Sequence, residues 1–482
     1  RHTSVRFSYG NYNQINTSVL HNQPLSRKMS LMMNFNQLHN GGFYTNAYTN
    51  EAVDKLDSYS GRIKLLYNPS DKLRMQYTFQ FENNEQGGYP YALYDKTTQK
   101  AGEIKYDHWS GYMRDLISNG LNIEYTGSFY RLRAVTSYQY MDDEQDIDQD
   151  FTERDMYYVG QWQKQNMIGQ EISFQSFEND RYEWLLGVFG FHQTLDKQVD
   201  VTYGKVLQAA QNLPGELVVS KIYNNSNSGL AAFHQSTLKF GDLSIIGGIR
   251  IDSETAKLDY QHYQTLVGNS TQKEDVQSSM ADVEILPRFA LQYNITSNMT
   301  PYATIAKGYN AGGFNSTFER EEDRSFKAER SWNYEAGLKA RFFSNRLFTN
   351  LAVFMIDWTN QQIYQPVPSG QGSMLKNAGK SESKGFELEI KAVPYTNFEV
   401  WATAGYNEAK FVEYVRSSTL DYSTNYLPYV PARTASLGGN YTVNVNHKIL
   451  RNIHLYSVYQ IFGKHYWHED NSAWQDDYAL LN

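Results

Sequence analysis

The sequence predicts an all-β fold, an antiparallel β-barrel that crosses a membrane, and three patterns in its 482 residues support this fold class. Apolar and polar residues alternate through many segments. Short polar turns recur at nearly regular intervals, with long polar stretches between them. Tyr, Phe and Trp make up 15% of the chain, and Tyr is the most frequent of the three. Side chains with an apolar ring and a polar tip suit the boundary between lipid and water.

Alternation is the primary signal. In residues 73–81 every odd-numbered residue is apolar or aromatic and every even-numbered residue is polar. Similar patterns occur in residues 121–126, 288–294 and 386–390. Successive side chains of a strand point to opposite faces, so each segment has one apolar and one polar face. Such strands fit either a half-solvated sheet or a membrane barrel.

The spacing of the turns favours the barrel. Successive turns lie roughly 45 to 65 residues apart, each between two strands of about 10 to 15 residues. The expected turns are Pro24–Ser26, Pro69–Lys72, Gly127–Ser128, Glu178–Asp180, Gly241–Asp242, Thr296–Asn298, Ser344–Arg346, Tyr395–Asn397 and the longer Asn444–Asn452. Long polar stretches, such as residues 87–119 and 260–282, separate the hairpins. This asymmetry is typical of outer-membrane barrels with short periplasmic turns and long extracellular loops.

Nine turns join eighteen strands, and segments at residues 4–9 and from Tyr478 onward raise the total to about twenty. Open sheets rarely exceed ~10 strands, so closure into a barrel is expected. Because the chain begins in one strand-like segment and stops in another, we expect it to be a fragment at both ends.

Several classes of protein are disfavoured. The chain has no Cys, which excludes disulfide scaffolds and thiolate metal sites. Its net charge of -8 argues against a nucleic-acid partner. It contains neither a Gly-x-Ser-x-Gly nor a His-Glu-x-x-His motif, so we expect no enzyme activity.

Four segments, in the order Tyr302–Asn315, Glu329–Lys339, Ala352–Trp358 and Asn377–Glu387, resemble the TonB-dependent outer-membrane receptors. The resemblance is greatest to the siderophore and pesticin-receptor-like branch and covers roughly residues 285–440. It implies a 22-stranded barrel filled by an N-terminal plug domain, with ligand bound between the plug and the external loops. We expect residues 1–482 to be an incomplete barrel domain without the plug, the energy-coupling box and the last two or so strands.

The resemblance implies an active-transport receptor in the outer membrane of a Gram-negative bacterium, in contact with lipid and lipopolysaccharide. The plug would connect it to the TonB energy-transducing complex, and a ferric siderophore is the favoured cargo. We expect a monomeric barrel with no cofactor, because iron would enter only as part of the transported chelate. A passive porin, a receptor for haem or another small ligand, and a soluble or surface-anchored β-rich binding protein remain alternatives.

Two groups of residues are candidates for functional contacts. Aromatic residues expected in external loops offer rigid rings for binding cargo. These residues are Tyr89, Tyr91, Trp109, Tyr157, Tyr158, Trp162, Trp467 and Trp474. Charged residues in alternating segments are expected to face the lumen and to pair with one another or with the plug. These residues are Arg288, Glu335, Lys339, Arg341 and Glu387.

Three further features favour structural explanations. The acidic run at residues 142–150 is expected to be a solvated external loop, although alternate carboxylates could bind an ion. Gly308, Gly312 and Gly313 are expected to give one strand a bend or room for a large neighbouring side chain. His465 and His468 are three residues apart on an expected strand, which makes a poor metal chelate.

Overall fold

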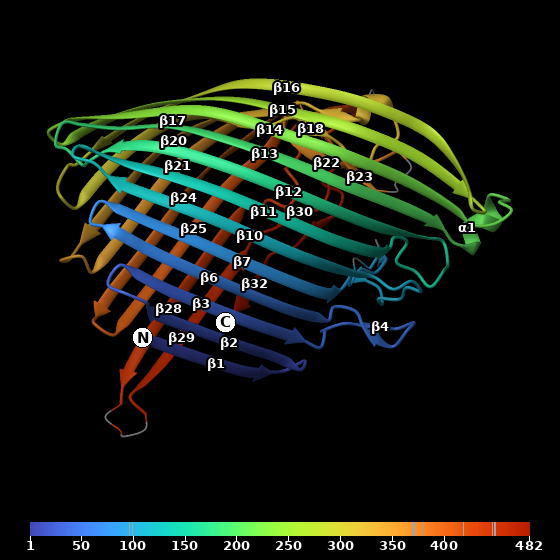
Figure 1. The fold of residues 1–482 in the computed structure, drawn as a ribbon, viewed down its shortest axis with the longest axis horizontal. Coiled ribbons are helices and arrows are strands. Elements are labelled where there is room, and N and C mark those ends of the chain that lie inside the picture. Colours follow the sequence, from blue (N-terminus) through green and yellow to red (C-terminus); the bar gives the residue numbers. More distant parts are fainter. Residues whose placement is uncertain are drawn as a thin grey trace. The chain divides into compact units, whose positions relative to one another are not determined.

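Long antiparallel strands account for most of this computed structural model (Figure 1). The structure describes residues 1–482 except 96, 99, 369–371, 378, 418, 446, 448 and 449. In this described part, twenty strands belong to one sheet. They are β1 (His2–Gly10), β2 (Gln14–Pro24), β3 (Met29–Asn40), β6 (Leu56–Ser70), β7 (Leu73–Gly87), β10 (Gly111–Thr126), β11 (Tyr130–Asp148), β12 (Tyr157–Ser176), β13 (Tyr182–Tyr203), β14 (Leu217–Phe240), β15 (Leu243–Leu266), β16 (Asn269–Tyr293), β17 (Met299–Asn310), β20 (Glu329–Phe342), β21 (Leu347–Thr359), β24 (Lys380–Tyr395), β25 (Phe398–Glu413), β28 (Arg433–Asn444), β29 (Asn452–Phe462) and β32 (Tyr478–Leu481).

Short strand pairs and two helical segments lie in the connections between the long strands. They are β4 (Thr45–Asn46), β5 (Glu51–Ala52), β8 (Tyr94–Asp95), β9 (Lys100–Ala101), α1 (Lys205–Ala210), β18 (Gly313–Phe314), η1 (Glu321–Asp323), β19 (Ser325–Phe326), β22 (Gln362–Pro366), β23 (Ser373–Asn377), β26 (Val415–Ser417), β27 (Leu420–Asp421), β30 (His465–Tyr466) and β31 (Trp474–Gln475). Over the described residues, no helix has the length and apolar character needed to cross a membrane.

The predicted turns and strand number are confirmed. Each of the eight turns predicted between residues 24 and 397 separates two consecutive long strands, and twenty strands are present among the described residues. In the turn after β20, Phe343, Ser344 and Asn345 all have positive φ angles, which reverses the chain in few residues. Part of the ninth predicted turn, at residues 446, 448 and 449, lies outside the described residues.

The prediction of a long polar loop at residues 260–282 is wrong. The sheet strands β15 and β16 continue through this stretch and are joined by Val267 and Gly268, whose φ angles are 47° and 78°. Two consecutive positive φ angles are the geometry of a tight hairpin turn. The stretch at residues 87–119 is also shorter than expected, because β10 already begins at Gly111.

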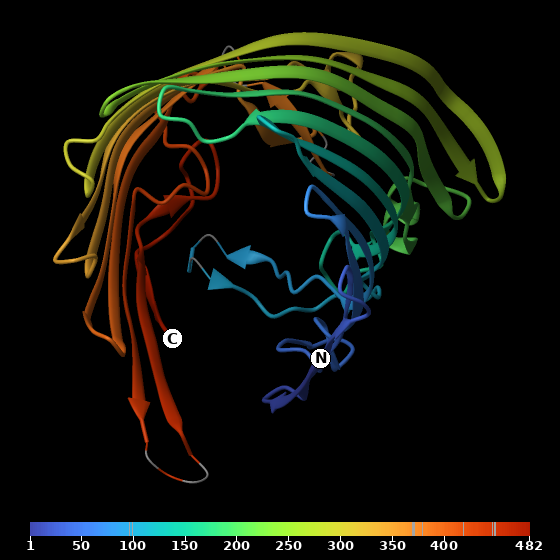
Figure 2. The ribbon, with the colours of Figure 1, turned by 60° about the vertical axis from the view of Figure 1, so that its left-hand side comes forward.

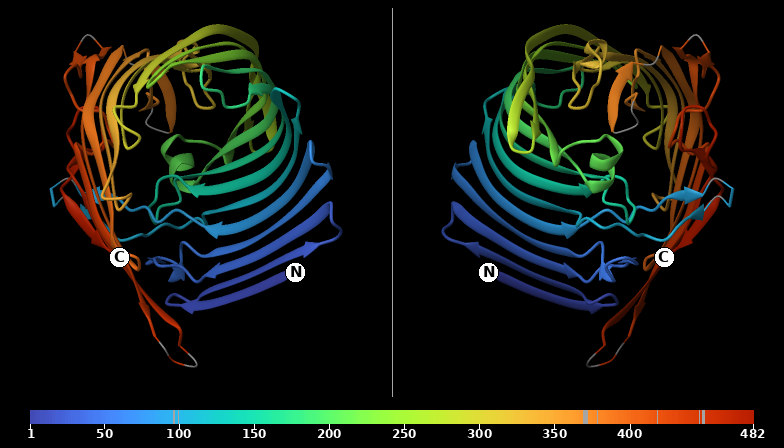
Figure 3. Two further views of the ribbon diagram at one scale, coloured as in Figure 1. Left: turned by 90° about the vertical axis from the view of Figure 1, so that its left-hand side faces the viewer. Right: turned by 90° about the vertical axis from the view of Figure 1, so that its right-hand side faces the viewer.

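The described chain divides into two compact units. Unit 1 comprises residues 1–177, 187–232 and 253–281, and unit 2 comprises residues 178–186, 233–252 and 282–482. In unit 1, strands β1, β2, β3, β6, β7, β10, β11 and β12 pair in this order as consecutive antiparallel neighbours, shown in blue to teal in Figure 1. At the loop end of this unit lies α1, as Figure 3 shows.

In unit 2, strands β17, β20, β21, β24, β25, β28, β29 and β32 also pair in order as antiparallel neighbours. Figure 2 shows the later strands of this unit side by side in orange and red. The register is continuous except near the ends of β24. Neighbouring side chains on one face therefore come from adjacent strands at fixed positions.

Each unit has an apolar face and a polar face of its sheet. In β21, Leu351, Val353 and Met355 are exposed, whereas the intervening Ala352 is buried. In unit 1, the apolar side chains of Ile63 and Tyr77 are likewise exposed, at 41% each. An uncovered apolar face of this kind is unfavourable in water but suits hydrocarbon. We call this side the apolar face and the other side, which carries most of the charges, the polar face.

The three glycines predicted to lie in one strand are divided between elements. β17 contains Gly308, Gly312 follows the strand, and Gly313 lies in β18. A Cβ at Gly312 would approach the Phe326 carbonyl oxygen to 2.8 Å, and one at Gly313 would approach the Phe326 ring to 2.8 Å. The predicted room for a large neighbour is therefore present at Gly313, whereas Gly312 allows a close approach of two backbone segments.

Candidate functional site

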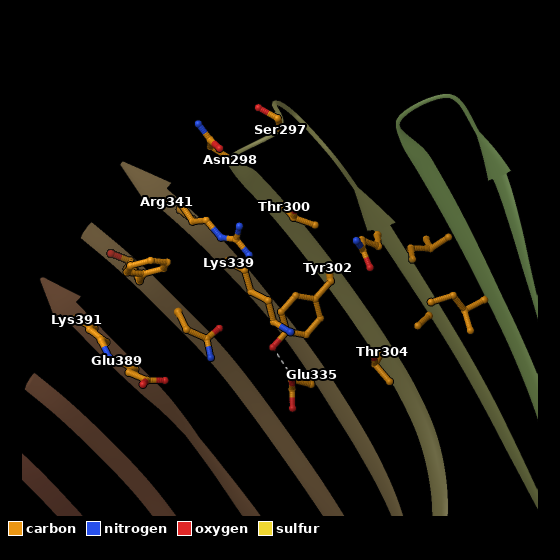
Figure 4. A pocket seen from close by; sticks show the side chains of 18 of the residues that line it. Ser297, Asn298, Thr300, Tyr302, Thr304, Glu335, Lys339, Arg341, Glu389 and Lys391 are labelled. Carbon is orange, nitrogen blue, oxygen red and sulfur yellow. Dashed lines mark hydrogen bonds between the residues drawn. The ribbon is translucent and has the colours of Figure 1, made fainter. Parts of the chain in front are cut away.

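The polar face of unit 2 carries a cavity of about 800 Å³ near the turn between β16 and β17 (Figure 4). Side chains from β15, β16, β17, β20, β21 and β24 line it. The register explains this gathering, because Thr304 lies opposite Glu335 and Thr300 lies opposite Lys339 on adjacent strands. Charged lining residues are Arg288, Glu335, Lys339, Arg341, Glu389 and Lys391.

One aromatic residue organises the centre of this cavity. The Tyr302 hydroxyl donates a hydrogen bond of 2.6 Å to Glu335 Oε1. The ring lies over Gly337, where a Cβ would come within 2.6 Å of ring atoms. On the ring itself, Lys339 Nζ lies 5.3 Å from the centroid, within the range of a cation–π contact. A side chain at position 337 would displace the ring, so this glycine sets the position of the hydroxyl.

The structure brings four of the five predicted lumen charges together. Arg288, Glu335, Lys339 and Arg341 line the cavity, whereas Glu387 lies on the same face, opposite Ala352, but outside the cavity lining. Among the described residues, none of these five side chains forms an ion pair. Their charges are therefore available to a group outside this chain.

The predicted set omitted Tyr302, Glu389 and Lys391, which complete the cavity. Lys391 Nζ is 2.9 Å from Glu399 Oε1, so this cation has a partner within the sheet. All three residues alternate with apolar neighbours, and that signal could have placed them on the polar face. Only the register between strands shows that they surround one cavity.

A second cavity, of about 390 Å³, lies at the loop end of unit 1, between the connection that joins β3 to β6 and the connection that joins β7 to β10. Tyr106 is buried there and donates a hydrogen bond of 3.0 Å to the Gly88 carbonyl oxygen. Burial raises the pKa of Tyr106 to about 12. The side-chain amide of Asn46 donates to the Tyr106 carbonyl oxygen at 2.8 Å. These bonds hold two separate connections against each other.

The wall of this second cavity is fixed by His108. Its ring stacks on Tyr158 with centroids 3.8 Å apart, and its backbone N–H donates to Asp148 Oδ2 at 3.0 Å. Asp148 also accepts the Phe151 N–H at 2.9 Å and is almost completely buried. Burial lowers the pKa of His108, because a charged imidazole would lose its hydration. The neutral ring is therefore favoured in this contact.

The buried Asp148 corrects the prediction that residues 142–150 form a solvated loop. Strand β11 extends to Asp148, and Asp143 is also buried, with its carboxylate accepting hydrogen bonds from Tyr112 and Gln163. The physical reason is that carboxylates with several donors can be buried in polar surroundings. Among the described residues, no group of three or more His, Asp or Glu side chains is arranged to hold a metal ion.

The predicted cargo-binding aromatic residues lie in three places. Tyr89, Tyr91 and Trp109 lie in the connection between β7 and β10, where Tyr91 contacts Phe151 edge to face at 5.2 Å. The Trp109 ring covers Gly111, and Trp109 remains 54% exposed. The exposed rings of Tyr91 and Trp109 are available for contact with a ligand, whereas Tyr89 is half-buried.

Three of the residues expected in loops lie in a strand instead. β12 begins at Tyr157 and includes Tyr158 and Trp162. The strand is twenty residues long, about twice the length that spans a membrane, so its first residues lie beyond the lipid and need no apolar alternation. Trp162 packs its ring over Gly160.

The two remaining tryptophans belong to the last connection of unit 2. Trp467 contacts the rings of Tyr429 and His465, at centroid distances of 5.6 and 5.0 Å. Trp474 lies under Lys464 Nζ, 4.1 Å from the ring centroid. His465 is buried by these neighbours. Both tryptophans therefore pack connections together within unit 2.

The connections of unit 2 are also held by a small hydrophobic core. Phe411, Tyr414 and Leu427 are buried together, and Gln365 donates a hydrogen bond to the Tyr414 hydroxyl. Burial raises the pKa of Tyr414. Near it, Asn315 donates to two backbone carbonyl groups and accepts one N–H, all at 2.8 Å. Connections that are fixed in this way present a preformed surface.

Comparison with known proteins matches this architecture. Residues 4–482 match the family model described as "TonB dependent receptor-like, beta-barrel". The pesticin receptor of Yersinia enterocolitica is 27% identical over 295 residues, which cover 59% of this chain and 42% of the receptor. The aligned region thus spans less than half the length of that relative.

Solved structures share the fold. The ferric yersiniabactin uptake receptor FyuA from Yersinia pestis superimposes with a TM-score of 0.82 and 20% identity, covering 99% of this chain and 71% of that one. The siderophore receptor PiuA from Acinetobacter baumannii gives a TM-score of 0.78 and 14% identity, covering 98% of this chain and 73% of that one. The predicted antiparallel barrel fold is confirmed.

Proposed function

Because the chain belongs to the TonB-dependent receptor β-barrel family, we propose that its parent protein is an active-transport receptor of the outer membrane of a Gram-negative bacterium. It binds a scarce nutrient outside the cell and imports it with energy from the TonB complex. The observation that carries this proposal is the family match over residues 4–482, on a sheet with one apolar and one charged face. Such a sheet suits a wall between hydrocarbon and a watery interior.

A ferric siderophore is the proposed cargo. The named relatives are receptors for pesticin, for ferric yersiniabactin and for a siderophore, and this chain resembles each of them. Its connections are fixed by buried hydrogen bonds and stacked rings, and exposed rings such as Tyr91 and Trp109 remain free for contact. Preformed aromatic surfaces bind flat, ring-bearing ligands at a low entropic cost. No cofactor is needed, because iron is part of the cargo.

The unpaired charges around the first cavity support contact with an N-terminal plug domain. Arg288, Lys339 and Arg341 offer donors, and Glu335 and Glu387 offer acceptors, on the polar face of unit 2. A folded domain seated there would satisfy both signs of charge, as protein interfaces commonly do. In this proposal residues 1–482 form part of one monomeric barrel domain, in contact with lipid and lipopolysaccharide, and its work is binding and gating without catalysis.

Uptake of iron-55 chelates by cells with the full-length receptor tests this function. We expect iron restriction to induce the receptor, and accumulation to require both the receptor and TonB. Accumulation that persists without TonB would support a passive porin instead. Recovery of the receptor in the soluble fraction would support a β-rich binding protein, and uptake of haem alone would identify a different cargo.

Two variants test the site. Tyr91→Ala combined with Trp109→Ala should weaken binding of the chelate at the cell surface, because both exposed rings lie at the loop end. The matched control is Phe129→Ala, which removes a ring that is 70% exposed in the turn between β10 and β11. Equal loss of binding in the two receptors would contradict the assignment of these rings to cargo binding.

A further inference from the structure

A group of unpaired cations lies at the turn end of unit 1. We call it the turn-end basic patch and define it as Arg27, Lys28, Lys72, Arg74, Arg131 and Arg133. The first five line a cavity of about 1000 Å³, together with the carboxylates of Asp71 and Glu124. All six cationic side chains are exposed.

The register places the strand residues of the patch next to one another. Arg74 in β7 lies opposite Glu124 in β10, and Glu124 lies opposite Arg133 in β11. Two register positions nearer the turn, and so on the same face, Arg131 lies opposite Thr126. Residues 74, 124 and 133 therefore form a row across three strands on the polar face. The turn residues at 27, 28 and 72 complete the cavity at the same end.

The positive charges of the patch are almost unneutralised by carboxylates of the chain. Lys28 Nζ donates to the Pro69 carbonyl oxygen at 2.5 Å, and Arg133 Nε donates to the Asn122 side chain at 3.3 Å. Within the described part of the chain, none of the six cations lies within ion-pair distance of a carboxylate. Six cations and two carboxylates leave a local net charge of +4. The chain as a whole has a net charge of -8.

The charges around the unit 2 cavity are arranged differently. Lys391 is paired with Glu399, and Lys339 lies over a tyrosine ring. Two carboxylates, Glu335 and Glu389, lie among the cations there. A mixture of both signs suits contact with a resident protein surface, whereas a cluster of one sign on a concave surface concentrates mobile counter-ions. Rings of Arg and Lys have this role in anion-conducting pores.

We propose that the turn-end basic patch is an anion-attracting site on the release path and that the cargo is a negatively charged chelate. This inference rests on the proposed function, in which the turn end faces the periplasm. Four of the six cations are arginines, whose planar guanidinium groups bind carboxylate and similar oxygen anions through two parallel hydrogen bonds. Exposed, unclamped side chains hold such an anion briefly and release it, which suits transport.

The test uses the full-length receptor with the triple substitution R74Q/R131Q/R133Q, and R74K/R131K/R133K as the charge-preserving control. The probes are the iron-55 complexes of a tris-catecholate, net charge -3, and of a tris-hydroxamate, net charge 0. The Gln triple should import the trianionic complex roughly tenfold more slowly, as expected for lost electrostatic steering. Binding at the cell surface should stay unchanged, and the Lys triple should import at the normal rate.

A second measurement does not depend on which complex the receptor accepts. Citrate at low ionic strength should bind the purified receptor in calorimetry, and the Gln triple should lose this binding. Equal citrate binding by both receptors, or none by either, would overturn the proposal. Normal import by the Gln triple, or import of the neutral complex alone, would also overturn the proposal. Increased protease sensitivity of the plug in the Gln triple would overturn it too, because it would assign the patch to contact with an acidic plug surface. Failure to bind any ferric chelate, with citrate binding intact, would contradict the proposed cargo instead.

Discussion

Substituting Val353 by Arg tests whether the apolar face meets hydrocarbon. Val353 is the seventh residue of β21 and is 51% exposed on the apolar face, opposite Ala336 and Phe386 of the neighbouring strands. Six steps of about 3.3 Å place it about 20 Å along the strand from the turn. With a tilt of about 40° this is about 15 Å along the membrane normal, close to the middle of an apolar band about 25 Å tall.

At that depth an arginine on the lipid face costs about 2 to 4 kcal/mol. The folded-to-unfolded ratio should fall by roughly 30- to 900-fold. The assay is equilibrium unfolding of the full-length receptor in phospholipid vesicles, followed by tryptophan fluorescence.

The control is Thr403→Arg, on the polar face opposite Glu389. Thr403 shares a 2.7 Å hydrogen bond with Ser436, so its loss should cost only about 1 kcal/mol. If Val353→Arg were no more destabilising than this control, the assignment of the two faces would be refuted.

Three further outcomes are expected. Asp148→Ala should raise the hydrogen-exchange rate of the His108 amide by roughly 10- to 100-fold, because a hydrogen bond to a charged acceptor contributes about 1.5 to 3 kcal/mol. An unchanged exchange rate would argue against this hydrogen bond. The His108 ring should titrate below its ordinary pKa of about 6.5 in an NMR titration. Since this pKa is lowered in the folded state, the ring's contribution to stability is present above pH 6.5 and is lost as the pH falls toward the folded-state pKa. Better protection of the loop amides from hydrogen exchange at acidic pH would contradict this pH dependence. Gly385→Ala would place a Cβ 1.8 Å from the Tyr406 carbonyl oxygen and should destabilise the fold by at least about 3 kcal/mol, which lowers the folded fraction on heat-modifiability gels. Gly439→Ala, with no atom closer than 3.6 Å to the new Cβ, should fold normally. Similar folded fractions of the two variants would refute the close contact at Gly385.

The sequence predicted the spanning parts of the fold well, because lipid on one side and water on the other impose a two-residue period. Turn positions followed from the same period, as at Gly241, whose φ angle is +59°. The period disappears where strands leave the lipid, since both faces then meet polar surroundings. For that reason the hairpin around Val267 and the start of β12 at Tyr157 were predicted as loops.

The candidate site was predictable only in part. Alternation places Glu335 and Lys339 on the polar face, and the structure finds them beside one cavity. Their relation to Tyr302 depends on the register of β17 against β20, which one strand's sequence does not contain. The burial of Asp148 depends on residues about forty positions away, because the His108 N–H donates to its carboxylate and Ser110 Oγ accepts its backbone N–H. These distant partners leave no local signal, so the acidic neighbours of Asp148 suggested a solvated loop.

The two-residue turn at Val267 and Gly268 is a suitable site for attaching a label. β15 and β16 contain 24 and 25 residues, whereas roughly eleven suffice to span a membrane, so their tip should stand well clear of the lipid. Val267 is 56% exposed, and nothing lies within 4 Å of a Cβ at Gly268. A short peptide tag inserted between these residues would carry a fluorophore outward, where single receptors could be followed on living cells.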